Sequence, residues 1–321
     1  MIIVTGAAGF IGSCLIKALN NKGFTEIVIV DDFEQEKKKH NYSSKSFAQQ
    51  IDRMSLIPWL KDNHSKVSFV FHLGARTDTT LFDTDIFDKL NLNFSKAVWA
   101  CCAFHGIPLL YASSAATYGD GSHGYNDDTE LLDFLKPLNP YGDSKHEFDK
   151  WAISQTDKPP YWVGLKFFNV FGPNEYHKGR MASVVFHAFN QIKERGALKL
   201  FKSHRSDYED GMQKRDFIYV KDVVDVCLFF HSQQAASGIY NLGTGCAHSF
   251  LDLGEACFEA LNMTPKISFI DIPEDIRNTY QYFTEAPMKK LRSNGYQKPF
   301  TPLNKAIKDY VRNYLETGSY F

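Results

Sequence analysis

The chain has 321 residues, in which 36 Lys and Arg balance 37 Asp and Glu to give a formal net charge of -1. This balance argues against binding to nucleic acid or a membrane surface, because both depend on an excess of basic residues. The length suits two domains or one large α/β unit. No apolar run approaches the roughly 18 residues that a membrane-spanning helix needs.

The cysteines and the N-terminal residues indicate the cellular compartment of the protein. None of the cysteines forms a C-x-x-C pair, and several lie in apolar stretches, so we expect free thiols in a reducing compartment and no metal site. A glycine motif begins within six residues of Met1, which leaves no room for a signal peptide. We therefore expect a cytoplasmic enzyme. The cysteines are Cys14, Cys101, Cys102, Cys227, Cys246 and Cys257.

In the first half of the chain, short apolar runs alternate with helical patterns. This rhythm predicts an α/β fold, a Rossmann-type doubly wound parallel sheet with helices on both faces. Strands are predicted at residues 2–4, 27–30, 67–73, 108–114 and 162–168, and helices at residues 10–20, 91–104 and 141–153.

After residue 171 the rhythm is less regular. We predict a dinucleotide-binding domain over residues 1–170, which residues 216–245 rejoin. A smaller, mixed α/β domain over residues 171–321 is expected to be mainly substrate-binding. Its predicted helices lie at residues 183–193, 222–230, 250–261 and 303–315, and its predicted strands at residues 217–220 and 239–242.

The first predicted strand ends in a glycine motif typical of dinucleotide sites. Gly6, Gly9 and Gly12 allow a tight turn, close approach of a pyrophosphate and close packing of helix on sheet. Asp31 follows the next strand, where a carboxylate can accept hydrogen bonds from the adenosine ribose. This acid favours NAD, whereas basic residues such as Lys38 and Arg53 could hold the 2′-phosphate of NADP. The choice between the two cofactors stays open.

A second constellation combines Tyr141 and Lys145 with Ser114. The Y-x-x-x-K spacing places Tyr141 and Lys145 on one face of a helix, about one turn apart. A neighbouring ammonium favours the phenolate, so we expect the pKa of Tyr141 to move down towards neutrality. Ser114 ends a predicted strand, from which its hydroxyl could bond a substrate oxygen. We predict that these three residues are catalytic.

These motifs resemble the extended short-chain dehydrogenase/reductase family of nucleotide-sugar epimerases and dehydratases over essentially the whole chain. Within it, the segment HKGRMAS points to the epimerases that invert C6 of an ADP-heptose. The other matching segments are widely shared. The matching segments are residues 1–12, 111–119, 167–173, 177–187, 214–223 and 241–245.

The resemblance implies an isomerase that oxidises C6 of ADP-D-glycero-D-manno-heptose to an aldehyde and re-reduces it on its other face. Tightly bound NAD or NADP, one per subunit, would carry the hydride, so no second substrate is needed. Tyr141 and Lys178 match the two acid/base groups of the family, although Lys178 could instead bind a phosphate. The product would enter lipopolysaccharide biosynthesis. A homo-oligomer, a pentamer in this family, is also implied.

Further site residues follow from the resemblance, position by position. His187 and Phe201 have alternative interpretations, as a core histidine and a packing residue. The cofactor set is Gly6, Gly9, Phe10, Ile11, Gly12, Asp31, Asp32, Lys38, Arg53, Leu73, Gly74, Ala75, Arg76, Thr77, Asn91, Tyr141, Lys145, Val170 and Lys178. The substrate set is Ser114, Asn169, Arg180, His187, Phe201, Lys202, Ser203, His204, Arg215 and Tyr280.

Several positions depart from the family pattern. Leu73 stands in place of a glutamate, Arg180 in place of a serine, and the link at residues 203–213 is longer than usual. Asp32 in place of an asparagine adds negative charge where the phosphate of NADP would lie. The alternatives are a UDP-hexose 4-epimerase and a nucleotide-binding sensor without turnover. A dehydratase would carry an Asp-Glu pair where Ala115 and Ala116 stand.

Overall fold

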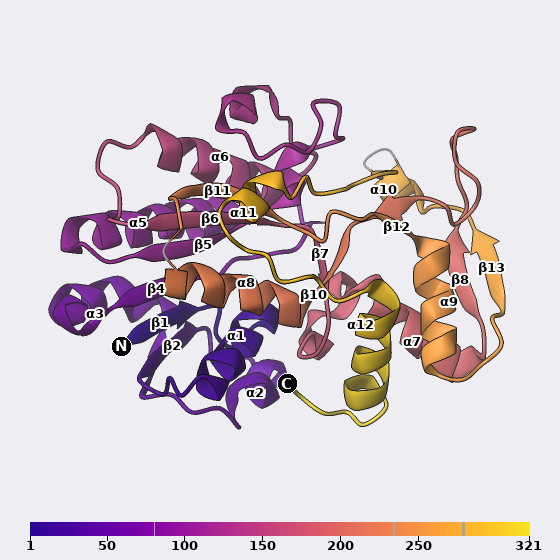
Figure 1. Ribbon diagram of the computed structural model, residues 1–321, viewed down its shortest axis with the longest axis horizontal. Coiled ribbons are helices and arrows are strands. Elements are labelled where there is room, and N and C mark those ends of the chain that lie inside the picture. The colour runs from indigo at the N-terminus through magenta and orange to yellow at the C-terminus, as the bar shows by residue number, and fades with distance from the viewer. Residues whose placement is uncertain (80, 234, 278–279) are drawn as a thin grey trace.

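The computed structural model describes residues 1–79, 81–233, 235–277 and 280–321 (Figure 1). Within these residues, a central sheet of seven parallel strands has the order β11-β6-β5-β4-β1-β2-β3. The order reverses between β1 and β4, and ligands of such sheets bind where the carboxyl ends of the strands border this crevice. The strands are β1 (Ile2–Thr5), β2 (Ile27–Asp31), β3 (Gln49–Asp52), β4 (Phe69–His72), β5 (Leu109–Ser114), β6 (Trp162–Phe167) and β11 (Gly238–Leu242).

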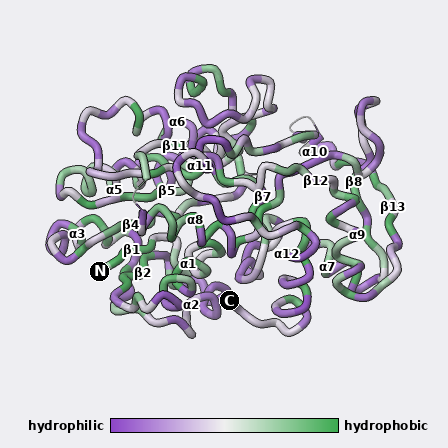
Figure 2. Tube along the Cα trace, in the orientation of Figure 1, coloured by the Kyte–Doolittle hydropathy of each residue, from purple (hydrophilic) through white to green (hydrophobic). Residues whose placement is uncertain are grey.

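Alternation along the strands builds two apolar cores, one on each face of the sheet. Ile2 and Val4 belong to the core beneath α1 and α8, whereas Ile3 between them belongs to the opposite core. Hydrophobic residues are accordingly concentrated along the central strands (Figure 2). This confirms the predicted α/β class and doubly wound sheet. The covering helices are α1 (Phe10–Asn21) and α8 (Val220–Gln233) on one face, and α3 (Leu56–Asn63), α5 (Phe94–His105) and α6 (Pro140–Ser154) on the other.

The rest of the chain forms small two-stranded sheets with helices beside them. The pairs are β7 (Asn169–Phe171) with β10 (Phe217–Tyr219), β9 (Lys214–Arg215) with β12 (His248–Ser249), and β8 (Leu198–Phe201) with β13 (Ile267–Ile270). The longer helices are α7 (Val184–Arg195), α9 (Phe250–Ala260) and α12 (Leu303–Tyr310), which gather at the right of Figure 1. Short helices are α2 (Lys39–Tyr42), α4 (Thr84–Phe87), α10 (Glu274–Arg277) and α11 (Lys289–Ser293).

The elements differ from the predicted ones in a few places. The sequence gives no sign of β3, because only Ile51 of this edge strand is buried and no apolar run results. Wider helical turns at Asp88–Asn93 and Val311–Leu315 adjoin α5 and α12, so both predicted helices are only partly regular. In the described ranges, no helix has the length and apolar character needed to cross a membrane.

Candidate active site

The turn between β1 and α1 fits a dinucleotide pyrophosphate. Gly6 has φ +68°, and a Cβ on it would lie 2.8 Å from Cα of Gly74, so only glycine fits there. A Cβ on Gly12 would lie 2.1 Å from the carbonyl oxygen of Gly6, which holds α1 close against the turn. Helix N-termini present unpaired N–H groups to anions. Phe10 and Ile11, the first residues of α1, line the cleft described below.

At the end of β2, each predicted cation is paired with a carboxylate. Asp31 Oδ2 accepts a hydrogen bond from Ala8 N at 2.9 Å, and its Oδ1 accepts one from Lys38 Nζ at 3.2 Å. Arg53 Nη2 lies 3.4 Å from Asp32 Oδ2. The charges of Lys38 and Arg53 are therefore largely balanced where the adenosine ribose of a dinucleotide would lie.

A cleft of about 340 Å³ brings together the predicted catalytic residues Ser114, Tyr141 and Lys145. Lys145 is 4% exposed and donates a hydrogen bond to the carbonyl oxygen of Ala112 at 2.8 Å. Burial lowers the pKa of Lys145 to about 8, and the nearby Asp149 carboxylate opposes this shift. Because this pKa lies close to neutral pH, small changes in the surroundings of Lys145 alter the fraction of the side chain that is charged.

The prediction for the pKa of Tyr141 is wrong for this structure. Burial raises the pKa of the Tyr141 phenol, and a hydrogen bond with Ser114 opposes the increase only in part. Desolvation disfavours the phenolate more than the sequence argument allowed. A lowered pKa therefore needs more positive charge around the phenol than the chain alone supplies.

Lys178 reaches the same cleft from the segment between β7 and α7. Its Nζ lies 5.4 Å from the centre of the Phe10 ring at the start of α1. Burial lowers the pKa of Lys178, and the Glu175 carboxylate raises it. Glu175, which the sequence analysis missed, is fully buried and accepts hydrogen bonds from Ser183 N at 2.5 Å and Ser183 Oγ at 2.7 Å. An acid in a polar loop gives no signal of this role.

Most of the remaining cofactor set lies at or beside the cleft. Leu73, Ala75, Thr77 and Val170 line it. Asn91 is different: it is 1% exposed and is not among the residues that line the cleft, so its contact with the cofactor stays a prediction. Its amide instead joins neighbouring elements, by accepting from Arg76 N at 2.7 Å and donating to Arg76 O and Ser144 Oγ at 3.0 Å.

Part of the substrate set gathers around Arg215, outside the residues that line the cleft. Arg215 is 7% exposed, and no carboxylate lies within ion-pair distance of its guanidinium among the described residues. It donates to the carbonyl oxygens of Lys214 and Gln281 and lies 5.4 Å from the centre of the Tyr280 ring. Phe201 packs against Tyr280, with ring centres 6.0 Å apart. Asn169, by contrast, lines the cleft itself.

The other predicted substrate residues point to local roles. Lys202 Nζ lies 3.7 Å from Asp271, and His204 accepts from Ile272 N at 3.3 Å. Ser203 donates to Arg205 O at 2.8 Å. His187 lies 3.3 Å from the carbonyl oxygen of Arg180, and neither residue lines the cleft. The structure thus does not bring these residues to the predicted bases.

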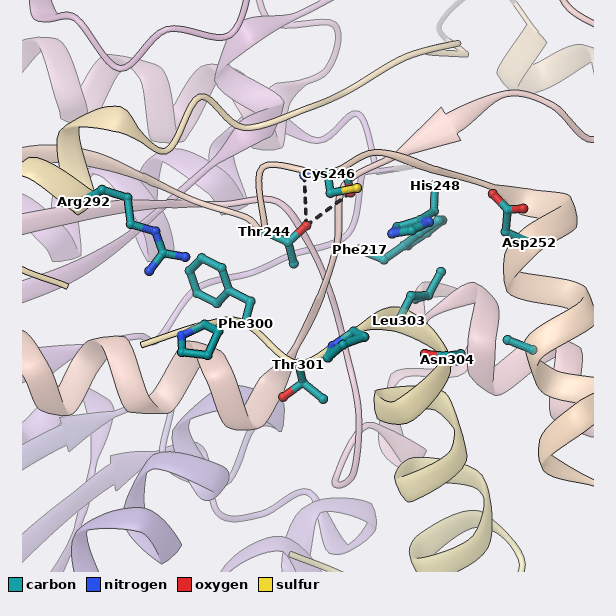
Figure 3. A pocket seen from close by; sticks show the side chains of 13 residues that line it. Phe217, Thr244, Cys246, His248, Asp252, Arg292, Phe300, Thr301, Leu303 and Asn304 are labelled. Atoms are coloured by element: carbon teal, nitrogen blue, oxygen red, sulfur yellow. Dashed lines mark hydrogen bonds between the residues drawn. The ribbon is translucent and has the colours of Figure 1, made fainter. Parts of the chain in front are cut away.

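A second cavity of about 560 Å³ lies between the Thr244–His248 segment and α12 (Figure 3). Its walls include Phe217, Phe300 and the exposed Cys246, whose backbone contacts the Thr244 hydroxyl. None of the predicted catalytic residues is among its described lining residues. We therefore place the candidate active site at the smaller cleft.

Comparisons with known proteins find relatives that match essentially the whole chain. A relative from Fusobacterium nucleatum, named ADP-L-glycero-D-manno-heptose-6-epimerase, is 49% identical over 98% of each chain. A relative of the same name from Nitratidesulfovibrio vulgaris strain DP4 is 43% identical over 100% of each chain. The crystal structure of the Helicobacter pylori ADP-L-glycero-D-manno-heptose-6-epimerase is 27% identical, with a TM-score of 0.81, and the match covers 97% of this chain and 95% of that one. The model of the NAD dependent epimerase/dehydratase family matches residues 2–243, and the chain belongs to that family.

Proposed function

We propose that the chain inverts C6 of ADP-D-glycero-D-manno-heptose to give ADP-L-glycero-D-manno-heptose. The observation that carries this proposal is that Tyr141 and Lys178 enter one cleft from different elements, α6 and the segment before α7. The C6 oxygens of the two epimers point to different sides of the hydride donor, so two proton-transferring groups suit the reaction. The names of the full-length relatives support the same substrate.

Ser114, Tyr141 and Lys145 would act on the oxygen of one epimer. The Ser114 and Tyr141 hydroxyls would orient the C6 oxygen. Tyr141 would take its proton as the phenolate, once positive charge from the bound dinucleotide adds to that of Lys145 and lowers the pKa of the phenol. When bound, the dinucleotide would accept the C6 hydride and return it to the opposite face. Because C6 of a heptose is bonded to both C5 and C7, the oxidised carbon is a ketone, which replaces the expected aldehyde.

Lys178 would serve the oxygen of the other epimer. Its burial lowers the pKa of the ammonium, which brings the neutral amine closer to the working pH. The Phe10 ring lies beside the Lys178 ammonium and shields one side of it from solvent. Lys178 would thus exchange a proton with the substrate, and its contact with Phe10 would hold the ammonium beside the start of α1.

Arg215 would bind the diphosphate of the substrate. A buried guanidinium without a carboxylate partner is costly, and a diphosphate anion would offset that cost through bidentate hydrogen bonds. Tyr280 packs beside Arg215, Phe201 packs against Tyr280, and these two rings would flank the nucleotide. This gives the chain a substrate site separate from the NAD site.

The cofactor that we propose is NAD and not NADP. Lys38 and Arg53 are each paired with a carboxylate, Asp31 and Asp32. A 2′-phosphate at this place would be repelled by both carboxylates, and the two cations that could bind it are already paired with them. The family to which the chain belongs is NAD dependent, which agrees with this preference.

The direct test is to incubate the purified protein with ADP-D-glycero-D-manno-heptose and to separate the two C6 epimers. The nucleotide released on denaturation is identified in the same preparation. We expect epimers to interconvert in protein that releases NAD. No interconversion by NAD-loaded protein would contradict the proposal. Turnover of UDP-glucose instead would indicate a 4-epimerase, and turnover of neither sugar a nucleotide-binding sensor.

A further inference from the structure

The segment that carries Lys178 is bonded to the last residues of the chain through Asn174. Asn174 is 0% exposed and has φ 76°. Its amide oxygen accepts from Phe321 N at 2.9 Å, and its amide nitrogen donates to Phe321 O at 3.1 Å and to Ser13 Oγ at 2.9 Å. Because Ser13 belongs to α1, one side chain joins the final residues, the Lys178 segment and the helix at the cofactor turn.

Two more buried side chains complete this junction from the nucleotide side. Asn41 is 1% exposed, and its amide nitrogen donates to Ala8 O at 2.9 Å and to Asn174 O at 3.1 Å. Lys45 is 8% exposed and donates to Phe321 O at 2.7 Å. Ala8 lies within the glycine-rich turn, so the junction contacts the loop that we expect to hold the pyrophosphate.

Tyr176 provides a second attachment, two residues before Lys178. Its hydroxyl lies 3.0 Å from Tyr314 O and 2.9 Å from Ser319 O, between which it shares its proton. The Tyr176 ring also packs on the Tyr320 ring, with centres 4.9 Å apart. We call residues 314–321 the C-terminal strap, because they contact the Lys178 segment along its first turn. Figure 1 shows the end of the chain beside α1 and α2.

We propose that Asn174 and Tyr176 are positioning residues, through which the C-terminal strap sets the place of Lys178 relative to the start of α1. Lys178 N donates to Glu175 O at 2.9 Å, so the backbone between Asn174 and Lys178 is short and tightly turned. A change in the position of the Asn174 backbone therefore also moves Lys178, whose Nζ contacts the Phe10 ring. The catalytic consequence rests on the proposed function, in which Lys178 exchanges a proton with the substrate.

The principal test is Asn174→Gly in the cofactor-loaded protein. Glycine keeps the positive φ at this position but removes every side-chain hydrogen bond, so the backbone itself is not strained. Asn262→Gly is the matched control, because Asn262 also has a positive φ (55°) but lies after α9, where its amide oxygen accepts from Arg312. Hydrogen–deuterium exchange of residues 175–183 and the epimerisation kinetics are measured for both variants.

We expect Asn174→Gly to speed the exchange of residues 175–183 about tenfold. We also expect kcat to fall about tenfold with KM nearly unchanged, which corresponds to an increase of about 1.4 kcal/mol in the activation free energy. Asn262→Gly should change neither. Unchanged exchange would overturn the proposal. So would faster exchange spread over the whole chain, or faster local exchange with an unchanged kcat.

Tyr176→Phe provides an independent check, because it removes only the hydroxyl that contacts the strap. Tyr161→Phe is its control, since the Tyr161 hydroxyl is buried without a hydrogen-bond partner among the described residues. We expect faster exchange of residues 175–183 in Tyr176→Phe only. Exchange is measured without substrate, so a chain with no epimerase activity would still report on the strap, and the two proposals can fail separately.

Discussion

Arg53 Nη2 lies 3.4 Å from Oδ2 of Asp32, beside the pair that Lys38 forms with Asp31. A hydrogen bond from Gln35 lowers the pKa of Asp32, so its carboxylate stays ionised at neutral pH. Two acids therefore balance two cations at the end of β2. We expect this arrangement, and not the number of basic residues nearby, to set the preference of the site between NAD and NADP.

We predict that Asp32→Asn shifts the cofactor preference towards NADP. Loss of one carboxylate frees Arg53 for a 2′-phosphate, and one such ion pair changes the affinity ratio of NADP to NAD by about tenfold. Calorimetric titration of cofactor-free protein with each dinucleotide measures this ratio. Glu36→Gln is the control, since Glu36 pairs with Lys39 at an exposed position. Equal shifts in both variants would contradict the specific role of Asp32.

Tyr141→Phe should retain the nucleotide and lose at least about 100-fold in kcat, the usual effect of removing a general acid or base. The ring stays in place, and only the hydroxyl that contacts Ser114 is lost. Measured epimerisation is compared with Tyr296→Phe, whose buried hydroxyl has no hydrogen-bond partner in the described ranges. Full activity of Tyr141→Phe would show that another group moves this proton.

Lys178→Met should also abolish most turnover, because methionine fills similar space but cannot exchange a proton. We expect a loss of about 100-fold or more in kcat at an unchanged midpoint of thermal unfolding. Lys150→Met is the comparison, since Lys150 pairs with Asp133 at the surface and belongs to neither predicted site set. If Lys178→Met instead raised KM and left kcat unchanged, Lys178 would be a phosphate-binding residue.

Stability should fall in mild acid because of His72. Its ring nitrogens lie 2.8 Å from Thr5 Oγ1 and 2.9 Å from Ser95 Oγ, and burial lowers the pKa of His72 to about 3. The unfolded chain binds this proton near pH 6.5, so folding stability is complete above pH 6.5 and decreases as the pH falls towards 3. The loss from this group is at most about 1.4 kcal/mol per pH unit.

The His72→Gln variant checks this origin of the pH dependence. Glutamine can bond both hydroxyls but does not titrate, so the unfolding free energy should depend less steeply on pH between 6.5 and 4. Urea unfolding at several pH values measures the slope. His123→Gln, at an exposed position, should keep the slope of the original protein. Equal slopes for all three proteins would rule out His72 as the cause.

A strand or helix can be predicted from the sequence when most of its residues are buried, because burial selects a continuous or periodic apolar pattern. β1 and the first half of β5 are apolar runs, which is why both strands could be predicted, and the alternation with helices predicted that they belong to a parallel sheet. β3 gives no such signal, since it lies at the edge of the sheet and buries only Ile51. The wider turn at Asp88–Asn93 also has no local signature, because it is set by packing against α6 and α4.

The sequence by itself determined the dinucleotide turn and the Tyr141–Lys145 pair, because both depend on spacing within one or two adjacent elements. Only the tertiary structure decided what burial does to these groups, including the raised pKa of Tyr141 and the pairing of Arg53 with Asp32. It alone joins Asn174 to Phe321, residues far apart in the chain. Contacts of this kind arise from how the elements pack, and no local pattern of residues records them.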